Sequence, residues 1–347
     1  MRVGLVYDLL GGAPPAGATA DWDAEFEPEA TVECLEEALR DLGHMPVRIG
    51  DARALLAAIA AGALDVDAAV NIAEGYGNRN REAQAPVLLE LACVPYVGSD
   101  ALTLSLTLDK HMTKTALAAT LATPDWRVVR ASAAPADPPP FPVIVKPRYE
   151  GTAKGIAPSS RCENPAELGA EVARQHALYG QDLLIEAFVD GAEFTVGVVG
   201  EPPRALPALQ RATERSSGIG IHALERHEAP DAPFAYSLEG VLTPELESVL
   251  QDAAIRAHES LECRDFSRSD FRVDSADTAW FLEINPLPTF APDGTFAILA
   301  ELEGRSYRTF LAEILGPALE RAVERSAPDG ARTAVRRDGD PIEESAE

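Results

Sequence analysis

The sequence is short of basic residues, and that shortage excludes two classes of partner. Its 347 residues include 56 aspartates and glutamates but only 30 lysines and arginines, which gives a formal net charge of −26. Nucleic acids and anionic membranes both bind surfaces rich in lysine and arginine. We therefore expect neither as a partner, and the composition suits a soluble enzyme.

The sequence also lacks a cysteine pattern and a long apolar run. Its four cysteines are scattered and form no CxxC pair, so neither a zinc site nor a disulfide framework is predicted. No stretch approaches the ~18 apolar residues that a membrane-spanning helix needs. The opening MRVGLVYDLLGG lacks the features of a signal peptide and reads as a strand entering a glycine-rich turn. The expected location is the cytoplasm.

Lysine is rare enough for its positions to be informative. Arginine supplies most of the basic residues, and the four lysines all fall in one segment, at Lys110, Lys114, Lys146 and Lys154. A compact ammonium and a planar guanidinium serve different purposes. A lysine retained in an arginine-rich chain therefore favours a functional role for this segment.

The first hundred residues alternate short apolar runs with helical patterns. Strands are expected at 3–7, 46–49, 68–72 and 94–97, and helices at 29–42, 52–61 and 84–91. This alternation predicts a parallel sheet in an α/β lobe. Ligands of such sheets gather beyond the carboxyl ends of the strands, so the loops after Tyr7 and Ile72 are candidate binding loops.

The rest of the chain is expected to be mixed helix and strand. Helices are predicted at 109–121, 165–179 and 246–261, and strands at 142–146, 183–186, 193–199, 266–273 and 280–284. The last two strands should pair through a turn near 275–277. A length of 347 residues suits two or three packed lobes.

Four polar residues on the last two predicted strands form the first chemical motif. Arg268 and Asp270 share one face of their strand, and Glu283 and Asn285 share one face of the next. If the strands pair, two carboxylates and an amide oxygen converge, and these are ligands that suit Mg²⁺. The arginine could stabilise negative charge on a phosphoryl group or a tetrahedral intermediate. Half-buried strands with polar residues facing solvent would explain the pattern at least as well.

A second motif joins a strand end to a glycine-containing loop. The run VIVKP at 143–147 carries Lys146 to its end, and EGTAKG follows at 150–155. Backbone N–H groups, the Thr152 hydroxyl and the Lys154 ammonium could bind phosphate there. Neither a P-loop pattern nor GxGxxG is present, and an ordinary turn is the alternative explanation.

A third motif is the apolar strand LLIEAFV at 183–189, which runs into a short connection. Its backbone could pair with the edge of an adenine, and Glu193 could accept hydrogen bonds from ribose hydroxyls. A plain hairpin connection would explain the same residues.

In this order and spacing, the motifs resemble the ATP-grasp superfamily and, within it, the D-alanine–D-alanine ligase-like family. The resemblance covers roughly residues 1–320. It rests on PYVGS at 95–99 with LDK at 108–110, on VIVKP with EGTAKG, on LIEAFVDGAEFTV at 184–196, and on RSDFRVD at 268–274 with FLEINPLP at 281–288. Each segment is modest alone, but their combination is specific.

The resemblance implies an ATP-grasp fold with an N-terminal parallel α/β domain. The implied parts are a substrate domain over 1–103, a central ATP-grasp subdomain with the phosphate loop over 104–186, and a C-terminal subdomain with the metal and catalytic residues over 187–326. The polar segment 327–347 is expected to be a disordered tail.

The resemblance also implies how ATP and metal would be held. Contacts with ATP are implied for Lys110 and Lys146 at the phosphates, for Glu186, Phe188 and Val189 at adenine, and for Glu193 at the ribose. Thr152 and Lys154 would belong to a loop that closes over the γ-phosphate. Asp270, Glu283 and Asn285 would hold two Mg²⁺ ions, which Mn²⁺ could replace, and Arg268 would stabilise an acyl-phosphate and a tetrahedral intermediate.

The implied reaction is an ADP-forming ligation in two steps. A carboxylate attacks the γ-phosphate to give an acyl-phosphate, and an amine then displaces phosphate to give an amide. The partners are therefore a small carboxylate and a small amine, expected to be amino acids. Members of the family are often dimeric, so a homodimer is a further expectation, although the sequence itself does not indicate an interface.

The residues that would recognise the substrates depart from the family's pattern. An acidic residue after the first strand would hold the first substrate's ammonium, and Glu25, Glu27 and Glu29 are all candidates, with Glu27 favoured. Glu74 stands where D-alanine ligases typically carry a histidine. Arg81, in the same loop, is a further substrate candidate.

Two other expected substrate contacts are absent. The family's lysine–tyrosine pair has no match, since 211–226 contains no lysine, and the serine expected near 292–294 is not found. We therefore predict the family's chemistry on different substrates. A genuine D-alanine–D-alanine ligase remains an alternative, as does an inactive nucleotide-binding homologue, although the latter would be expected to lose Arg268 or a metal ligand.

Overall fold

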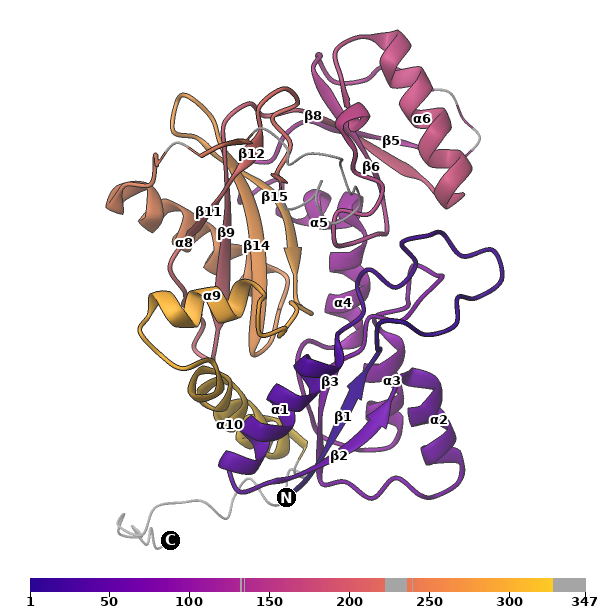
Figure 1. Ribbon diagram of the computed structural model, residues 1–347, viewed down its shortest axis with the longest axis vertical. Coiled ribbons are helices and arrows are strands. Elements are labelled where there is room, and N and C mark those ends of the chain that lie inside the picture. Colours follow the sequence, from indigo (N-terminus) through magenta and orange to yellow (C-terminus); the bar gives the residue numbers. More distant parts are fainter. Residues whose placement is uncertain (132, 134, 222–235, 239, 327–347) are drawn as a thin grey trace, which may run out of the picture.

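The structure, a computed structural model, describes residues 1–131, 133, 135–221, 236–238 and 240–326. The predicted tail at 327–347 lies outside the described residues. Three main sheets lie in 2–97, 126–187 and 192–285, and helices pack against each of them (Figure 1). The division at residues 103 and 186 stays a prediction.

The N-terminal sheet is parallel, as predicted. Its strands are β1 (Arg2–Tyr7), β2 (Met45–Gly50), β3 (Ala68–Ile72) and β4 (Tyr96–Val97), in the order β2-β1-β3-β4, and its helices are α1 (Glu29–Asp41), α2 (Ala52–Ala60) and α3 (Gln84–Leu91). Side chains of β1 alternate between two cores: Leu5 packs with α1, and Val6 packs with α2 and α3. The loops after Tyr7 and Ile72 consequently leave the same edge of the sheet.

A second sheet is antiparallel along its length and is covered by one helix. It contains β5 (Trp126–Val129), β6 (Val143–Pro147), β7 (Arg161–Cys162) and β8 (Leu183–Ala187), in the order β5-β8-β6-β7, and the helix is α6 (Pro165–Tyr179). Asn164 caps α6 by accepting from the Ala166 and Glu167 N–H groups. Leu168 and Val172 of this helix pack on the sheet.

The third sheet carries most of the polar motif residues. Its strands are β9 (Ala192–Val199), β10 (Arg204–Ala205), β11 (Leu209–Arg211), β14 (Phe266–Val273) and β15 (Ala279–Asn285). Helix α8 (Pro244–Ser260) covers one face, and β12 (Thr213–Glu214) pairs with β13 (Tyr236–Ser237). Helix α9 (Thr295–Leu302) leads to α10 (Tyr307–Ser326), which packs beside α1 in a core shared with the N-terminal sheet (Figure 1).

Several elements differ from the sequence predictions. The helix expected at 109–121 is α5 (Lys110–Leu117), and it is preceded by an unpredicted α4 (Ala101–Leu108). The break falls at Asp109, which is extended and caps α5 by accepting from the His111 and Met112 N–H groups. Strand β5 and helices α9 and α10 were also not predicted. No helix of the described residues could cross a membrane.

Candidate active site

A cavity of about 760 Å³ is lined by residues from all three sheets and their loops. Every residue predicted to contact ATP, metal or the reacting groups lines it, and so do Glu27 and Glu74. Arg81 does not line it and instead lies behind Glu25 and Glu74. The residues predicted from the sequence therefore lie around one cavity, and the role of each of them remains a prediction.

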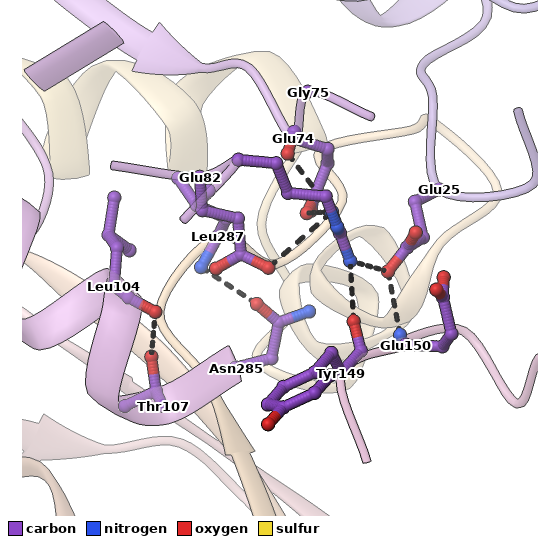
Figure 2. Close-up of polar contacts among 12 residues, drawn as sticks. Glu25, Glu74, Gly75, Glu82, Leu104, Thr107, Tyr149, Glu150, Asn285 and Leu287 are labelled. Carbon is purple, nitrogen blue, oxygen red and sulfur yellow. Dashed lines mark hydrogen bonds and ion pairs between the residues drawn. The ribbon is translucent and has the colours of Figure 1, made fainter. Parts of the chain in front are cut away.

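The predicted pairing of the two polar strands is confirmed. In the antiparallel register of β14 and β15, Arg268 lies opposite Asn285 and Asp270 lies opposite Glu283. The Arg268 Nη2 is 3.2 Å from Asp270 Oδ2. The Asn285 Oδ1 accepts a 2.8 Å hydrogen bond from the Leu287 N–H (Figure 2), which fixes the orientation of its amide. Two carboxylates and an amide oxygen thus share one patch of the cavity wall.

This patch fits a divalent cation that is shared with a ligand. Among the described residues, no three histidine, cysteine, aspartate or glutamate side chains converge as a metal cage. Mg²⁺ typically takes one or two carboxylates from the protein and completes its octahedron with water and phosphate oxygens. Asp270, Glu283 and the amide oxygen of Asn285 match that donor set.

Arg268 brings positive charge to the same patch. Burial opposes its charge, but Asp270 and Glu283 outweigh burial and raise the pKa of its guanidinium. Its Nε is buried and has no hydrogen-bond partner within the described part of the chain. An unpaired buried donor on a residue that lines the cavity is suited to an anionic ligand.

Glu186 lies between two of the clustered lysines. Its carboxylate is 2.9 Å from Lys146 Nζ and 2.6 Å from Lys114 Nζ. Burial opposes the charge of Glu186, but the two lysines outweigh it and lower its pKa. Lys114 is fully buried and donates to Thr123 Oγ1 at 2.8 Å, and burial lowers its pKa to about 8. No role was predicted for Lys114, although it belongs to the lysine cluster.

The connection that follows β8 is held by two arginines. The Phe188 ring lies 4.4 Å from the guanidinium of Arg161 and 4.8 Å from that of Arg272. Arg272 also donates to the Val189 carbonyl at 3.0 Å and pairs with Glu193 at 2.9 Å. Arg272 was not predicted, although it continues the alternation of Arg268 and Asp270 along β14.

The loop 150–155 is docked against the N-terminal part of the chain. Lys154 Nζ is 2.9 Å from carboxylate oxygens of both Glu25 and Glu150, and Glu25 also accepts from the Gly151 N–H at 2.7 Å. A Cβ on Gly151 would lie 2.5 Å from Glu25 Oε1, so this close approach needs glycine. Thr152 adopts a left-handed φ of 51°, a conformation that costs free energy and is typical of functional loops.

Of the three acidic residues predicted after the first strand, two line the cavity. Glu27 accepts hydrogen bonds from Thr31 Oγ1 at 2.7 Å and Thr289 Oγ1 at 2.9 Å. Glu25 binds Lys154 and is 2.6 Å from Arg81 Nη2. Glu29 is exposed and pairs with Arg48 outside the cavity. The carboxylate that joins the loops is therefore Glu25, whereas the prediction favoured Glu27 as a substrate ligand.

Arg81 is surrounded by more carboxylates than it can neutralise. Its guanidinium lies 2.6 Å from Glu25, 3.4 Å from Glu74 and 3.6 Å from Glu82, and Figure 2 shows these three side chains turned toward one another. Burial alone would raise the pKa of Glu25, but the positive charges of Arg81 and Lys154 outweigh burial and lower this pKa to about 2. Burial and Glu82 raise the pKa of Glu74 well above its ordinary value. Burial raises the pKa of Glu82 to about 7.

Glu82→Gln is expected to stabilise the protein at high pH only. The pKa of Glu82 is about 7 in the folded state and ordinary in the unfolded state. Below its unfolded pKa, the carboxyl is therefore neutral in both states. Folding stability then falls as pH rises through 7, by up to about 3 kcal/mol. Glutamine removes that loss, so urea unfolding should show the variant to be more stable than the native chain at pH 8 and equal at pH 4. Glu33→Gln, an exposed control on α1, should show no such difference. A gain that is the same at both pH values would contradict the raised pKa.

Arg211, at the end of β11, is a cavity residue that the sequence did not identify. Its Nη2 donates to Thr295 Oγ1 at 2.5 Å, and both residues line the cavity. The segment 211–226 contains no lysine, but the arginine at its first position lines the cavity. Residues 222–226 of that segment lie outside the described residues.

Comparison with known proteins gives a consistent result. Residues 119–316 match the family model for the D-ala D-ala ligase C-terminus. The D-alanine–D-alanine ligase of Alcanivorax borkumensis is 30% identical over 321 residues, which cover 92% of this chain and 95% of the relative. The ligase of Gluconobacter oxydans is 31% identical over 301 residues, which cover 83% and 93%. An uncharacterized protein of Sinorhizobium fredii is 30% identical over 263 residues, which cover 72% and 74%.

A solved structure shows the same fold along the chain. It is the D-alanine–D-alanine ligase of Bacillus anthracis complexed with ATP, which aligns with a TM-score of 0.68 at 20% identity. The alignment covers 94% of this chain and 99% of that one. The fold of this chain is therefore shared with that structure.

Proposed function

This chain belongs to the D-alanine–D-alanine ligase family of ATP-grasp, ADP-forming C–N ligases, and on that premise we propose that it joins two small substrates other than a pair of D-alanines. One substrate supplies a carboxylate and the other an amine, and both are amino acids or close relatives. The convergence of Arg268, Asp270, Glu283 and Asn285 on one wall of the cavity supports the reaction type, and the residues around the substrates support the altered specificity.

In the first step, a carboxylate oxygen of the first substrate attacks the γ-phosphorus of ATP. The bond to the β-phosphate oxygen breaks, and ADP and an acyl-phosphate result. Lys110 and Lys146 would contact the phosphates, and Phe188 and Val189 would contact the adenine. Lys154 would have to exchange Glu25 or Glu150 for a phosphate oxygen, because both carboxylates now neutralise it.

In the second step, the amine nitrogen of the second substrate attacks the acyl carbon. Phosphate leaves, the nitrogen loses a proton, and an amide remains. Arg268 would stabilise the negative charge that develops on oxygen, since its buried Nε is free to donate. Asp270, Glu283 and Asn285 would hold two Mg²⁺ ions, replaceable by Mn²⁺, and these would neutralise phosphate charge when bound.

Altered specificity is supported by the residues around the substrates. Glu74 replaces the histidine typical of D-alanine ligases, and it belongs to a buried acidic cluster around Arg81. The family's second-substrate lysine and serine have no counterparts, and Arg211 and Thr295 occupy the cavity wall instead. A genuine D-alanine–D-alanine ligase is the second candidate, because relatives that match 83% and 92% of this chain carry that name.

ADP release is expected to require a carboxylate and an amine together. The test uses the purified chain with ATP, Mg²⁺ and a panel of amino acids of both enantiomers, singly and in pairs, with mass spectrometry of the products. We expect the fastest pair to differ from D-alanine with D-alanine. D-alanyl-D-alanine as the main product would establish the second candidate. ATP binding without ADP release from any pair would favour an inactive homologue.

A further inference from the structure

Lys114 is a completely buried ammonium to which the proposed reaction gives no role. It lies one turn after Lys110 on α5, and Lys110 lines the cavity whereas Lys114 is not among the lining residues that the structure describes. Its Nζ is 2.6 Å from Glu186 Oε2 and donates to Thr123 Oγ1 at 2.8 Å and to the Phe281 carbonyl at 3.3 Å. A lysine is seldom buried so deeply unless it is paired. This one is enclosed by three oxygens.

The oxygens around Lys114 come from two sheets, which fixes the ammonium in place. Glu186 lies on β8 of the central sheet, and Phe281 lies on β15 of the third sheet. Thr123, on the connection between them, also donates to the Phe281 carbonyl at 3.1 Å, and the Phe281 N–H donates to the Ala122 carbonyl at 2.8 Å. Lys114 therefore cannot turn toward the cavity without breaking contacts between the two sheets.

Glu186 has one oxygen on each side of this arrangement. Its Oε1 lies 2.9 Å from the Nζ of Lys146, which lines the cavity as Glu186 does. Its Oε2 forms the ion pair with Lys114 but accepts no hydrogen bond within the described residues. An ionised carboxylate can only accept hydrogen bonds, whereas a protonated one can also donate. The protonation state of Glu186 therefore decides which ligand groups it can bind.

Lys114 is the cation that stays with Glu186 when nucleotide binds. In the proposed function Lys146 contacts the phosphates, so its ammonium would be shared with or transferred to them. A carboxylate left in a buried position without a cation is costly, and it takes up a proton instead. The fixed ammonium of Lys114 prevents this, because it lies behind Glu186 and has no path to the phosphates.

We propose that Lys114 is a positioning residue for nucleotide selection, which holds Glu186 ionised and in place so that it accepts a hydrogen bond from the 6-amino group of adenine. A base with a carbonyl oxygen at that position would face an acceptor and bind poorly. The inference rests on the proposed function, with Glu186 at the adenine, and adds a residue that acts on selectivity through Glu186.

The test measures binding of ATP and of inosine triphosphate, with Mg²⁺ and without other substrates, by isothermal titration calorimetry. Inosine carries a carbonyl oxygen where adenine carries the amino group. The native chain should bind ATP about 10-fold or more tightly than inosine triphosphate. Lys114→Met should weaken ATP binding by about 10-fold and bring the ratio of the two dissociation constants close to one, because a protonated Glu186 can donate to the carbonyl. Arg127→Met, which removes an exposed cation from β5 of the same sheet, should leave both constants unchanged.

A double-mutant cycle checks that Lys114 acts through Glu186. In the Glu186→Gln background, Lys114→Met should change the ratio of the two constants less than twofold, because the carboxylate on which Lys114 acts is already absent. Thermal unfolding reports whether each variant folds. Lys114→Gln, which keeps a donor but removes the charge, replaces Lys114→Met if the methionine variant does not fold, since removing one partner of a buried pair is destabilising.

Two results would overturn the inference. One is an equal loss of affinity for ATP and inosine triphosphate in Lys114→Met, which a purely structural role would produce. The other is a native chain that binds the two nucleotides equally well. Neither measurement needs turnover, so absent ADP release would contradict only the ligase proposal, whereas failure to bind any nucleotide would contradict both.

Discussion

Replacing Glu283 with glutamine is expected to lower kcat by about 100-fold or more and to raise the Mg²⁺ concentration needed for half-maximal rate by ~10–100-fold. Glutamine keeps the size of the side chain and one carbonyl oxygen but removes the charge. Glu283 lies opposite Asp270, so the variant would leave one carboxylate where two converge. A divalent ion is attracted far less to that patch, and Lys110, 3.7 Å away, loses its carboxylate partner.

The measurement is the rate of ADP release against Mg²⁺ concentration, with saturating ATP and the best substrate pair. Glu245→Gln, an exposed carboxylate in the first turn of α8, is the matched control and should behave as the native chain does. Mn²⁺ should support turnover of the native chain if the ligand set is as proposed. An unchanged Mg²⁺ dependence in Glu283→Gln would remove the metal assignment even if kcat fell.

Some of this architecture could be predicted because the relevant signals are local. The alternation of Arg268 with Asp270 and of Glu283 with Asn285 fixes which side chains share a face, and a short turn at 275–277 makes the two strands neighbours. The N-terminal strands and helices follow from periodic apolar residues and short connections. The structure contains these elements because each one buries the apolar face that its sequence pattern predicts.

Other parts depend on contacts between distant residues and were not predictable. Glu25 could not be chosen over Glu27 because its partners, Arg81 and Lys154, come from two other loops. Helix α9 follows a proline-rich turn and is short, so its pattern is weak. Arg211 lies on a three-residue strand, and its place in the cavity wall depends on the packing of β11 against β9.

The loop 150–155 shows how one contact can serve both packing and function. Lys154 is almost completely buried between Glu25 and Glu150, so the loop is docked on the N-terminal part of the chain. Breaking such a buried pair without replacing it is costly. A phosphate group could take the place of either carboxylate, which would make loop docking and nucleotide binding compete for the same ammonium.

Arg268→Lys is expected to lower kcat by about 100- to 1000-fold while leaving the Mg²⁺ dependence and the KM of ATP nearly unchanged. The two effects should separate because an arginine cannot ligate a metal, and its proposed role concerns charge that develops during the reaction. Lysine keeps the positive charge but lacks the Nε donor and the planar fork. The Nε of Arg268 is the atom that is buried without a partner within the described residues, so the conservative substitution removes the donor proposed to act.

The comparison with Glu283→Gln makes the Arg268 prediction specific. Both residues lie on the same wall of the cavity, and a merely structural role would move Mg²⁺ dependence, ATP binding and thermal stability together in both variants. Arg256→Lys, an exposed arginine on α8, controls for loss of a guanidinium. A shift of the Mg²⁺ titration in Arg268→Lys as large as that in Glu283→Gln would mean that the arginine acts by arranging the metal carboxylates. A kcat loss at constant Mg²⁺ dependence would place its action on the reacting oxygen.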